Sequence, residues 1–278
     1  MLSTEWNQRK KQYDVVIVGS GYGGTITAAR LSAATGSAKK SICILERGRE
    51  WPVGSFPDEP FKVAANVRNP LLNPLGLFDF LTFSDISIIK GSGLGGTSLV
   101  NANVAIVPDE ELFEGSAWPK NIKRSNLLPH YEAARKMLAA RPHPRAKELL
   151  KVQALDRRAK QLGTEAIGLD LVVNFDIDGP NAQGVEQKPC IDCGDCVTGC
   201  NVGAKNTLYM NYLPAAKRNG TEILTQTQVD WVQKLGTGGW RVYGRHFSAM
   251  GMPERFSLEA GIVVLSGGSL GTPEILLR

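Results

Sequence analysis

The chain has 278 residues, 42% of them hydrophobic and 21% charged, which suffices for the core of one large α/β domain or two smaller ones. The net charge is only +5, and the excess of Lys and Arg lies at 9–11 and 135–160. The second segment contains "KELLKVQALDRRAKQLG", the pattern of an amphipathic helix with a solvated basic face, so nucleic-acid binding is not expected.

The N-terminal residues 1–14 lack the apolar segment of a secretory signal. No run long enough to span a membrane is present, because "LLNPLGLFDFLTFSDISII" is interrupted by Pro74, Asp79 and Asp85. We therefore expect a cytoplasmic protein without a transmembrane segment. In a reducing compartment, clustered cysteines serve more often as metal ligands or redox groups than as structural disulfides.

Residues 13–46 have the pattern of a strand–turn–helix–strand unit. Residues 13–18 (YDVVIV) and 41–46 (SICILE) are short apolar runs, typical of buried parallel strands. An alanine-rich helical pattern lies between them, and Gly36 is expected to end it. Three glycines at G-x-G-x-x-G spacing precede the helix: Gly19, Gly21 and Gly24.

This spacing predicts a dinucleotide-binding site. Gly19 permits a tight turn, Gly21 lets the backbone approach a pyrophosphate, and Gly24 allows the helix to pack closely on the strand. The N-terminus of the helix offers unpaired N–H groups to the phosphates. Glu46 ends the second strand, where an acid binds a ribose hydroxyl and disfavours a 2′-phosphate, so NAD and FAD remain the alternatives.

Residues 90–108, "KGSGLGGTSLVNANVAIVP", contain a second glycine cluster. Its glycines stand at positions 91, 93, 95 and 96, directly before Thr97, Ser98 and Asn101. A flexible loop is the simplest interpretation, but such loops are seldom followed at once by an apolar run. The pattern favours a tight turn whose backbone wraps a large polar ligand.

Four stretches together resemble the glucose–methanol–choline oxidoreductase family, whose members oxidise alcohols with FAD. The first is "VIVGSGYGGTITAARL" with "ILERG" after it, and the second is "GSGLGGTSLVNANV", similar to the family signature beside the flavin. The third is "GTEILTQTQVDWV", where the family has a strand whose valine backbone meets the adenine. The fourth, "IVVLSGGSLGTPEILLR", is similar to the family's Gly-x-x-x-Thr-Pro turn into a helix. They occur in the family's order over residues 13–278.

The resemblance implies a Rossmann-like FAD-binding fold and an alcohol substrate whose hydride passes to flavin N5. Within the family, "GLGGTSLVNANV" is closer to the cholesterol-oxidase and long-chain-alcohol branches than to sugar oxidases, which implies a hydrophobic or sterol-like alcohol. The electron acceptor is not identified. The resemblance also implies a role for each matched residue. Gly19, Gly21 and Gly24 would hold the pyrophosphate of FAD, Glu46 its adenosine ribose, and the backbone of Val229 its adenine. Gly95, Gly96, Thr97 and Asn101 would line the pyrophosphate and the edge of the flavin, Ala102 and Asn103 would lie near the isoalloxazine, and the turn with Gly267, Gly268 and Thr272 would close over the cofactor.

The α/β fold is expected to be discontinuous. Residues 10–108 and 186–278 would form the two segments of the FAD-binding domain, and 109–185 a helical and strand segment of an incomplete substrate-facing domain. Pro119 and Pro129 are expected to punctuate the helices of this middle segment. A strand is expected at 169–177, "LDLVVNFDI".

The resemblance also implies a catalytic pair, a His with a second His or Asn, near the end of a chain about twice as long. Such a base is needed because the substrate hydroxyl must lose its proton to a group with a pKa near the working pH. The histidines at 130, 143 and 246 match neither catalytic position and are expected at the surface. The chain ends at Arg278, within a helix expected to begin at Pro273. We therefore expect a fragment that lacks the catalytic base, binds FAD poorly and aggregates when expressed alone.

Four of the five cysteines stand in "CIDCGDCVTGC", residues 190–200. Their C-x2-C-x2-C-x3-C spacing matches a ferredoxin-type run, although Asn201 replaces the final proline and no second cysteine set is present. Zinc sites usually separate their ligand pairs by a longer loop. The spacing favours an iron–sulfur cluster, with zinc, a disulfide and a metal-free thiol loop as alternatives, on the candidate ligands Cys190, Cys193, Cys196 and Cys200.

The leading functional interpretation is therefore an FAD-dependent oxidoreductase that acts on CH–OH donors. An iron–sulfur cluster near the flavin would pass electrons singly to an external acceptor, as in a dehydrogenase. The alternative is a catalytically silent FAD-binding or electron-transfer module that carries an iron–sulfur cluster. An NAD-dependent dehydrogenase would explain only the first fifty residues.

Overall fold

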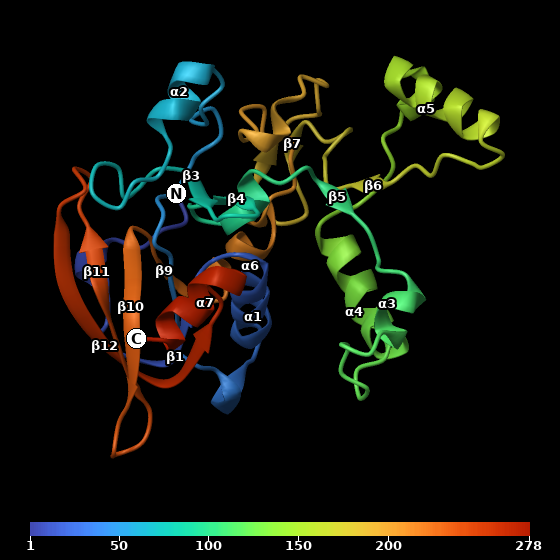
Figure 1. The fold of residues 1–278 in the computed structure, drawn as a ribbon. Coiled ribbons are helices and arrows are strands. Elements are labelled where there is room, and N and C mark those ends of the chain that lie inside the picture. Colours follow the sequence, from blue (N-terminus) through green and yellow to red (C-terminus); the bar gives the residue numbers. More distant parts are fainter.

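A six-stranded mixed sheet organises the chain (Figure 1), whose residues 1–278 are all described by a computed structural model. The strand order is β10-β11-β12-β1-β2-β9. Strands β12, β1, β2 and β9 are parallel to one another, whereas β10, β11 and β12 form an antiparallel meander. The strands are β1 (Gln12–Val18), β2 (Ile42–Leu45), β9 (Glu222–Leu224), β10 (Thr227–Lys234), β11 (Trp240–Phe247) and β12 (Pro253–Leu265).

Strand β1 lies inside the sheet, and successive side chains pack into different cores. Val15 and Ile17 point into a cluster under helices α1 (Tyr22–Ser32) and α6 (Tyr212–Arg218). Val16 and Val18 face a second cluster on the other side of the sheet. Burial on both faces explains why β1 and β2 read as continuous apolar runs.

The antiparallel meander covers the far side of the parallel strands. Phe256 and Leu258 of β12 and Val242 of β11 join the second core cluster, together with Ile275 of helix α7 (Gly268–Leu276). Trp231 and Tyr243 stack across β10 and β11 with ring centroids 3.9 Å apart. This meander brings residues 227–229 beside the carboxyl ends of the parallel strands, where the candidate site lies.

The remaining elements surround this sheet or extend from it. Figure 1 shows α3, α4 and α5 on one side of the molecule, away from the sheet. These elements are α2 (Pro60–Ala65), β3 (Phe78–Thr82), β4 (Ser87–Gly91), β5 (Val104–Ala105), α3 (Glu110–Glu114), α4 (Arg124–Met137), α5 (Leu150–Gln161), β6 (Asp170–Leu171), β7 (Gly179–Pro180) and β8 (Glu186–Gln187). No helix combines the length and the apolarity needed to cross a membrane.

The expected α/β class is confirmed, since strands from the beginning and the end of the chain share one sheet. The domain boundaries at 108 and 185 stay a prediction. The strand expected at 169–177 is shorter in the structure, where only Asp170–Leu171 forms a strand and pairs with β5. The residues that follow make isolated backbone hydrogen bonds to the segment around Lys205 and do not continue a ladder.

Two helix boundaries also differ from expectation. Pro129 lies inside α4 and does not end it. Helix α4 has no buried residue, so the carbonyl that the proline leaves without a donor has access to water. Helix α7 begins at Gly268 rather than at Pro273, because the Thr272 hydroxyl accepts from the Gly267 N–H and closes the turn earlier.

Ile17→Ala tests the central position of β1. Ile17 is completely buried, and we expect the substitution to lower the free energy of unfolding by about 2–5 kcal/mol through a cavity. The matched control is Ile262→Ala on the adjacent strand, where the side chain is 58% exposed and the expected loss is below about 1 kcal/mol. Urea denaturation of both variants measures the difference; equal losses would contradict this placement.

Candidate cofactor-binding site

A cavity of about 940 Å³ lies at the carboxyl ends of the parallel strands. The turns that follow β1, β2 and β12 line it, as do residues of β10 and the first part of α7. Ligands of α/β proteins bind in this place because several strand ends and their loops meet there. The cavity is therefore the candidate site.

The first glycine turn has the geometry that the sequence predicts. Gly19 has φ of 97°, and a Cβ there would lie 2.5 Å from the Ser266 carbonyl oxygen. A Cβ on Gly24 would lie 2.0 Å from the Gly19 carbonyl oxygen, so only glycine lets α1 pack on this turn. Gly21 has no neighbour within 4 Å of its Cβ direction and lines the cavity, which leaves its backbone accessible to a ligand.

Helix α1 begins at this turn and presents its N-terminus to the cavity. Its N-cap is Gly21, no side chain caps the free N–H groups, and no acidic residue lies in the first turn. Tyr22 and Gly23 line the cavity directly. Free N–H groups and the positive end of the helix dipole together suit an anionic ligand.

The second glycine turn touches the first. Gly95 and Gly96 have φ of 108° and 57°, and a Cβ on Gly96 would lie 3.0 Å from the Cα of Gly21. Thr97 lines the cavity and accepts from the Gly91 N–H at 3.2 Å. Two turns that are far apart in sequence thus form one wall of backbone, with little side-chain bulk between it and a ligand.

The buried hydroxyl of Ser20 connects these turns to Glu46. It donates to Glu46 Oε2 at 2.5 Å and accepts from the Gly95 N–H at 2.9 Å. Glu46 also accepts from the Ser20 and Gly48 N–H groups, at 3.0 and 2.8 Å. These bonds fix the carboxylate at the end of β2, where it lines the cavity.

Residues 101–103 lie beyond the residues that line the cavity. Asn101 Nδ2 donates to the hydroxyl of Tyr22, a lining residue, at 3.0 Å. Asn103 has φ of 66°, is buried, and its Oδ1 has no hydrogen-bond partner within the chain. A left-handed backbone and an unpaired buried oxygen are costly features that occur preferentially at functional sites.

A buried lysine holds the backbone at residues 99–101 by hydrogen bonds to its carbonyls. Lys205 is 1% exposed, and its Nζ donates to the carbonyls of Leu99, Asn101 and Cys196 at 3.0, 2.7 and 2.9 Å. All three ammonium hydrogens therefore have acceptors. Burial lowers the pKa of Lys205 to about 8. Because a trans peptide points its C=O and N–H in opposite directions, the Ala102 N–H points away from Lys205, and it has no acceptor within the chain.

Cations exceed acids along the cavity. Five Lys and Arg side chains line it, against Glu46 and Glu274. Three of these cations surround Asp79, whose carboxylate lies within 4 Å of Arg47, Arg68 and Lys90. Burial would raise the pKa of Asp79, but Arg47 and the other cations hold it below its usual range. One carboxylate does not balance three cations, so the wall favours an anionic ligand.

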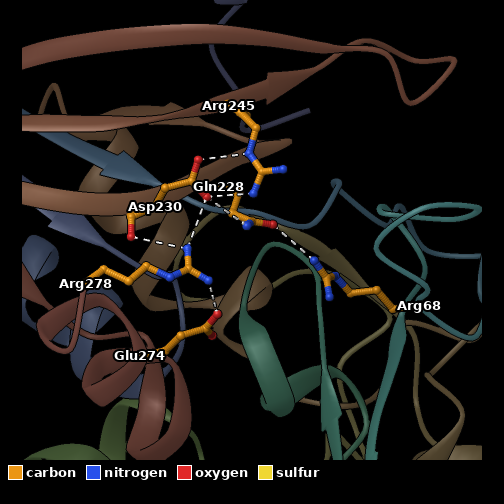
Figure 2. A network of polar contacts seen from close by, with 6 residues as sticks. All are labelled: Arg68, Gln228, Asp230, Arg245, Glu274 and Arg278. Carbon is orange, nitrogen blue, oxygen red and sulfur yellow. Dashed lines mark hydrogen bonds and ion pairs between the residues drawn. The ribbon is translucent and has the colours of Figure 1, made fainter.

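A polar network centred on Asp230 (Figure 2) contributes five of its six residues to the lining of the cavity. Arg245 donates to both carboxylate oxygens of Asp230, at 2.9 and 2.7 Å. Gln228 donates to Asp230 and accepts from Arg68, each at 3.1 Å. Arg278 connects Asp230 to Glu274 of α7. The network fixes β10 on both sides of Val229, the residue expected at the adenine.

The structure brings most of the expected FAD residues to one cavity, although their contacts with FAD stay a prediction. Gly24 and Gly95 lie behind the wall, and 101–103 lie beside it. The lining residues from the expected set are Gly19, Gly21, Glu46, Gly96, Thr97, Val229, Gly267, Gly268 and Thr272. No histidine lines the cavity.

Sequence reasoning missed the charged half of the site. Arg47 follows the expected ribose acid directly, so its position at a strand end was a usable signal. The sequence carries no such signal for Arg68, Lys90 and Arg245, because they come from segments that only the folded chain brings together. Lys205 was hidden in the same way, since a single lysine in "GAKNTLYM" looks like a surface residue.

The four clustered cysteines form no disulfide and lie apart from the cofactor cavity. They line a second, smaller cavity together with Lys205. No group of three or more Cys, His, Asp or Glu side chains is arranged to hold a metal ion. Cys43 is completely buried in β2, as expected of a core residue.

These observations fit FAD. The two glycine turns leave room that a Cβ would fill, the helix N-terminus and the cations suit a pyrophosphate, and the cavity has the size of a cofactor site. Glu46 would hold the ribose, and the backbone of Val229 the adenine.

Gly24→Ala tests the contact between α1 and the first turn. We expect a loss of FAD binding and a free energy of unfolding lower by about 1–3 kcal/mol, because the new methyl group must displace the Gly19 carbonyl. Gly168→Ala is the control, since nothing lies within 4 Å of its Cβ direction. FAD titration and denaturation measure both; unchanged affinity in the first variant would refute the contact.

Arg245→Met tests the polar network. It removes the bidentate pair with Asp230, and we expect FAD to bind about tenfold more weakly, because β10 loses its fixed position and Asp230 an important counter-charge. Arg241→Met is matched to it, since Arg241 lies on the same strand and pairs with Glu259 outside the cavity. Fluorescence titration should show near-normal affinity for that control, and equal weakening in both would contradict the assignment.

The chain is similar to proteins named cholesterol oxidase and long-chain-alcohol oxidase. It is 30% identical to cholesterol oxidases of Acinetobacter baumannii and Mycobacterium tuberculosis, over 96% and 97% of this chain and 50% and 48% of theirs. A long-chain-alcohol oxidase of Arabidopsis thaliana is 27% identical over 95% of this chain and 34% of its own length. The chain thus spans about half, or less, of the length of these relatives.

Solved structures share the fold. A fungal aryl-alcohol oxidase superposes with a TM-score of 0.57 over 95% of this chain and 47% of its own, at 16% identity. The family model described as GMC oxidoreductase, the glucose–methanol–choline family, matches residues 13–278. With the glycine turns and strand order described above, this match shows that the chain belongs to the GMC oxidoreductase family.

Proposed function

We propose that this chain is the FAD-binding part of an oxidoreductase that converts a hydrophobic or sterol-like alcohol to a carbonyl compound. The single observation that carries the proposal is the cavity in which both glycine turns, the α1 N-terminus and the Glu46 carboxylate meet. When bound, FAD supplies the acceptor for the two electrons that leave the alcohol carbon. The printed names of the relatives, cholesterol oxidase and long-chain-alcohol oxidase, support the substrate class.

The backbone of the chain would perform most of the binding. The N–H groups at the start of α1 and the turn at Gly96 would hold the pyrophosphate, and Arg47 and Lys90 would offset its charge. Glu46 would accept from the ribose hydroxyls. Its present bonds to Ser20 and Gly48 hold the carboxylate in place for that task.

The segment 101–103 would meet the redox-active end of the cofactor. Lys205 fixes the peptide between Asn101 and Ala102, so the free Ala102 N–H faces away from the lysine. This N–H would donate to the flavin, and the lysine charge would polarise the peptide bond that carries it. The unpaired Oδ1 of Asn103 would be a second polar contact in this region.

The general base would come from outside the cavity wall. The lining residues include no histidine, and the only acids among them, Glu46 and Glu274, already accept hydrogen bonds from Ser20 and Arg278. We propose that the base lies in the part that corresponds to the remaining length of the relatives. Oxidation of alcohols would then require both parts, and the electron acceptor would be chosen there.

Gly21→Val is the decisive experiment for FAD binding. Nothing lies within 4 Å of the Gly21 Cβ direction, so the free energy of unfolding without cofactor should change by less than about 1 kcal/mol. FAD should bind about 100-fold more weakly, because the side chain occupies ligand space. Absorbance of heat-released cofactor identifies the dinucleotide in the unsubstituted chain. Release of NAD, or unchanged affinity in the variant, would refute the proposal.

Alcohol oxidation is measured separately, on the chain alone and with the second part of a relative added. FAD binding with oxidation of a long-chain alcohol or sterol supports the whole proposal. FAD binding without turnover in either case favours the alternative, a module that binds FAD without catalysing alcohol oxidation.

A further inference from the structure

The cysteine loop, residues 190–200, encloses a cavity of its own. Its wall contains all four clustered cysteines and Lys205, together with the apolar residues Val173, Ile191, Val202 and Ala204. The cavity has a volume of about 20 Å³, which is enough to hold a water molecule. All four thiols are free. The loop is thus folded around a space and not around a disulfide.

The thiols line this space without converging on one point. No three Cys, His, Asp or Glu side chains are arranged to hold a single metal ion, whereas a structural zinc needs four donors around one centre. A polynuclear iron–sulfur cluster has a different requirement, because its four thiolates bind different irons and the cluster separates them. The arrangement therefore argues against a single zinc ion, and it is the cysteine spacing that favours a cluster.

The loop backbone curves around the space. Asp192, Gly194 and Gly199 have φ of 59°, 87° and 117°. Thr198 has a right-handed and Gly199 a left-handed backbone, and both of their N–H groups donate to the Asp195 carbonyl, at 3.1 and 3.2 Å, which closes the turn between Cys196 and Cys200. The Asp192 N–H already donates to the Cys190 sulfur at 3.4 Å. Hydrogen bonds of this kind stabilise cluster thiolates.

Lys205 supplies a buried positive charge at the cavity wall. Its three hydrogen bonds go to backbone carbonyls, which satisfy the donors but carry no net negative charge. A buried charge is costly unless an opposite charge lies nearby. Four thiolates around a cluster would provide that charge, and the bond to the Cys196 carbonyl fixes the ammonium to the loop.

We propose that the cysteine loop binds a polynuclear iron–sulfur cluster through Cys190, Cys193, Cys196 and Cys200, with Lys205 as its fixed counter-charge. The same ammonium holds the carbonyls of Leu99 and Asn101. Only the Lys205 side chain would therefore separate the cluster from residues 99–103, the segment that we expect at the flavin. The proposal deepens the proposed function and rests on it for the neighbouring FAD, whereas cluster binding is measured independently.

The test uses the full chain, purified without oxygen and reconstituted with ferrous iron and sulfide. Iron, acid-labile sulfide and FAD are quantified separately per chain. We expect either two irons with two sulfides or four of each, because both types of cluster take four cysteine ligands, and an electron paramagnetic resonance signal after reduction with dithionite. Cys190→Ser and Cys200→Ser should each lower the iron content several-fold. Cys43→Ser is the matched control and should leave it unchanged, because Cys43 lies in β2.

Lys205→Met should retain most of the iron and shift the cluster potential to more negative values, because removal of a nearby positive charge disfavours the added electron. Lys205→Arg should restore the potential, which distinguishes the charge from a merely structural role. The cluster proposal is overturned if the protein binds FAD but contains no iron and sulfide. One zinc per chain would overturn it too, as would equal iron contents in the serine variants and the unsubstituted chain. Iron and sulfide without FAD would refute the proposed function and leave the cluster in place.

Discussion

The hydroxyl of Ser20 is the interaction on which the candidate site depends. It is completely buried and connects the turn after β1, the Glu46 carboxylate after β2 and the Gly95 amide of the second glycine turn. A buried carboxylate is stable only when hydrogen bonds replace its lost water, and Ser20 supplies two of the three that Glu46 accepts. The three segments that meet at the cavity are thereby fixed relative to one another.

Electrostatics explains why this site needs the antiparallel meander as well as the parallel strands. The parallel strands supply backbone turns and Glu46, whereas Arg245 on β11 and Gln228 on β10 belong to the meander. Asp79 and Asp230 lie between these cations and reduce their mutual repulsion. An excess of positive charge remains at the wall, which is the arrangement expected where the ligand carries the missing negative charge.

Lys205 connects residues 99–101 to the cysteine loop. One ammonium bonds carbonyls from positions 99, 101 and 196, so the two loops cannot move independently without leaving a buried donor unpaired. The strand-like segment at Val173, which bridges Lys205, supports the lysine from the other side.

The sequence by itself determined the parts of the protein whose physics is local. The spacing of Gly19, Gly21 and Gly24 predicted a turn and a helix N-terminus, because backbone conformation depends on a few neighbouring residues. The apolar runs of β1 and β2 predicted burial on both faces of the sheet. The spacing of the four cysteines was likewise a local signal. Two helix boundaries were missed: Pro129 is tolerated inside the solvated helix α4, and the Thr272 hydroxyl accepts from the Gly267 N–H, so that α7 begins at Gly268.

Only the tertiary structure decided which distant side chains share the site. Strand pairing places Arg245 opposite Gln228, and the loop around Lys90 brings its ammonium beside Asp79, neither of which any periodicity encodes. Burial of Lys205 also depends on three segments folding together. Local patterns therefore predicted a dinucleotide site and a cysteine loop, whereas long-range packing determined the charge of the cavity and its connection to the loop.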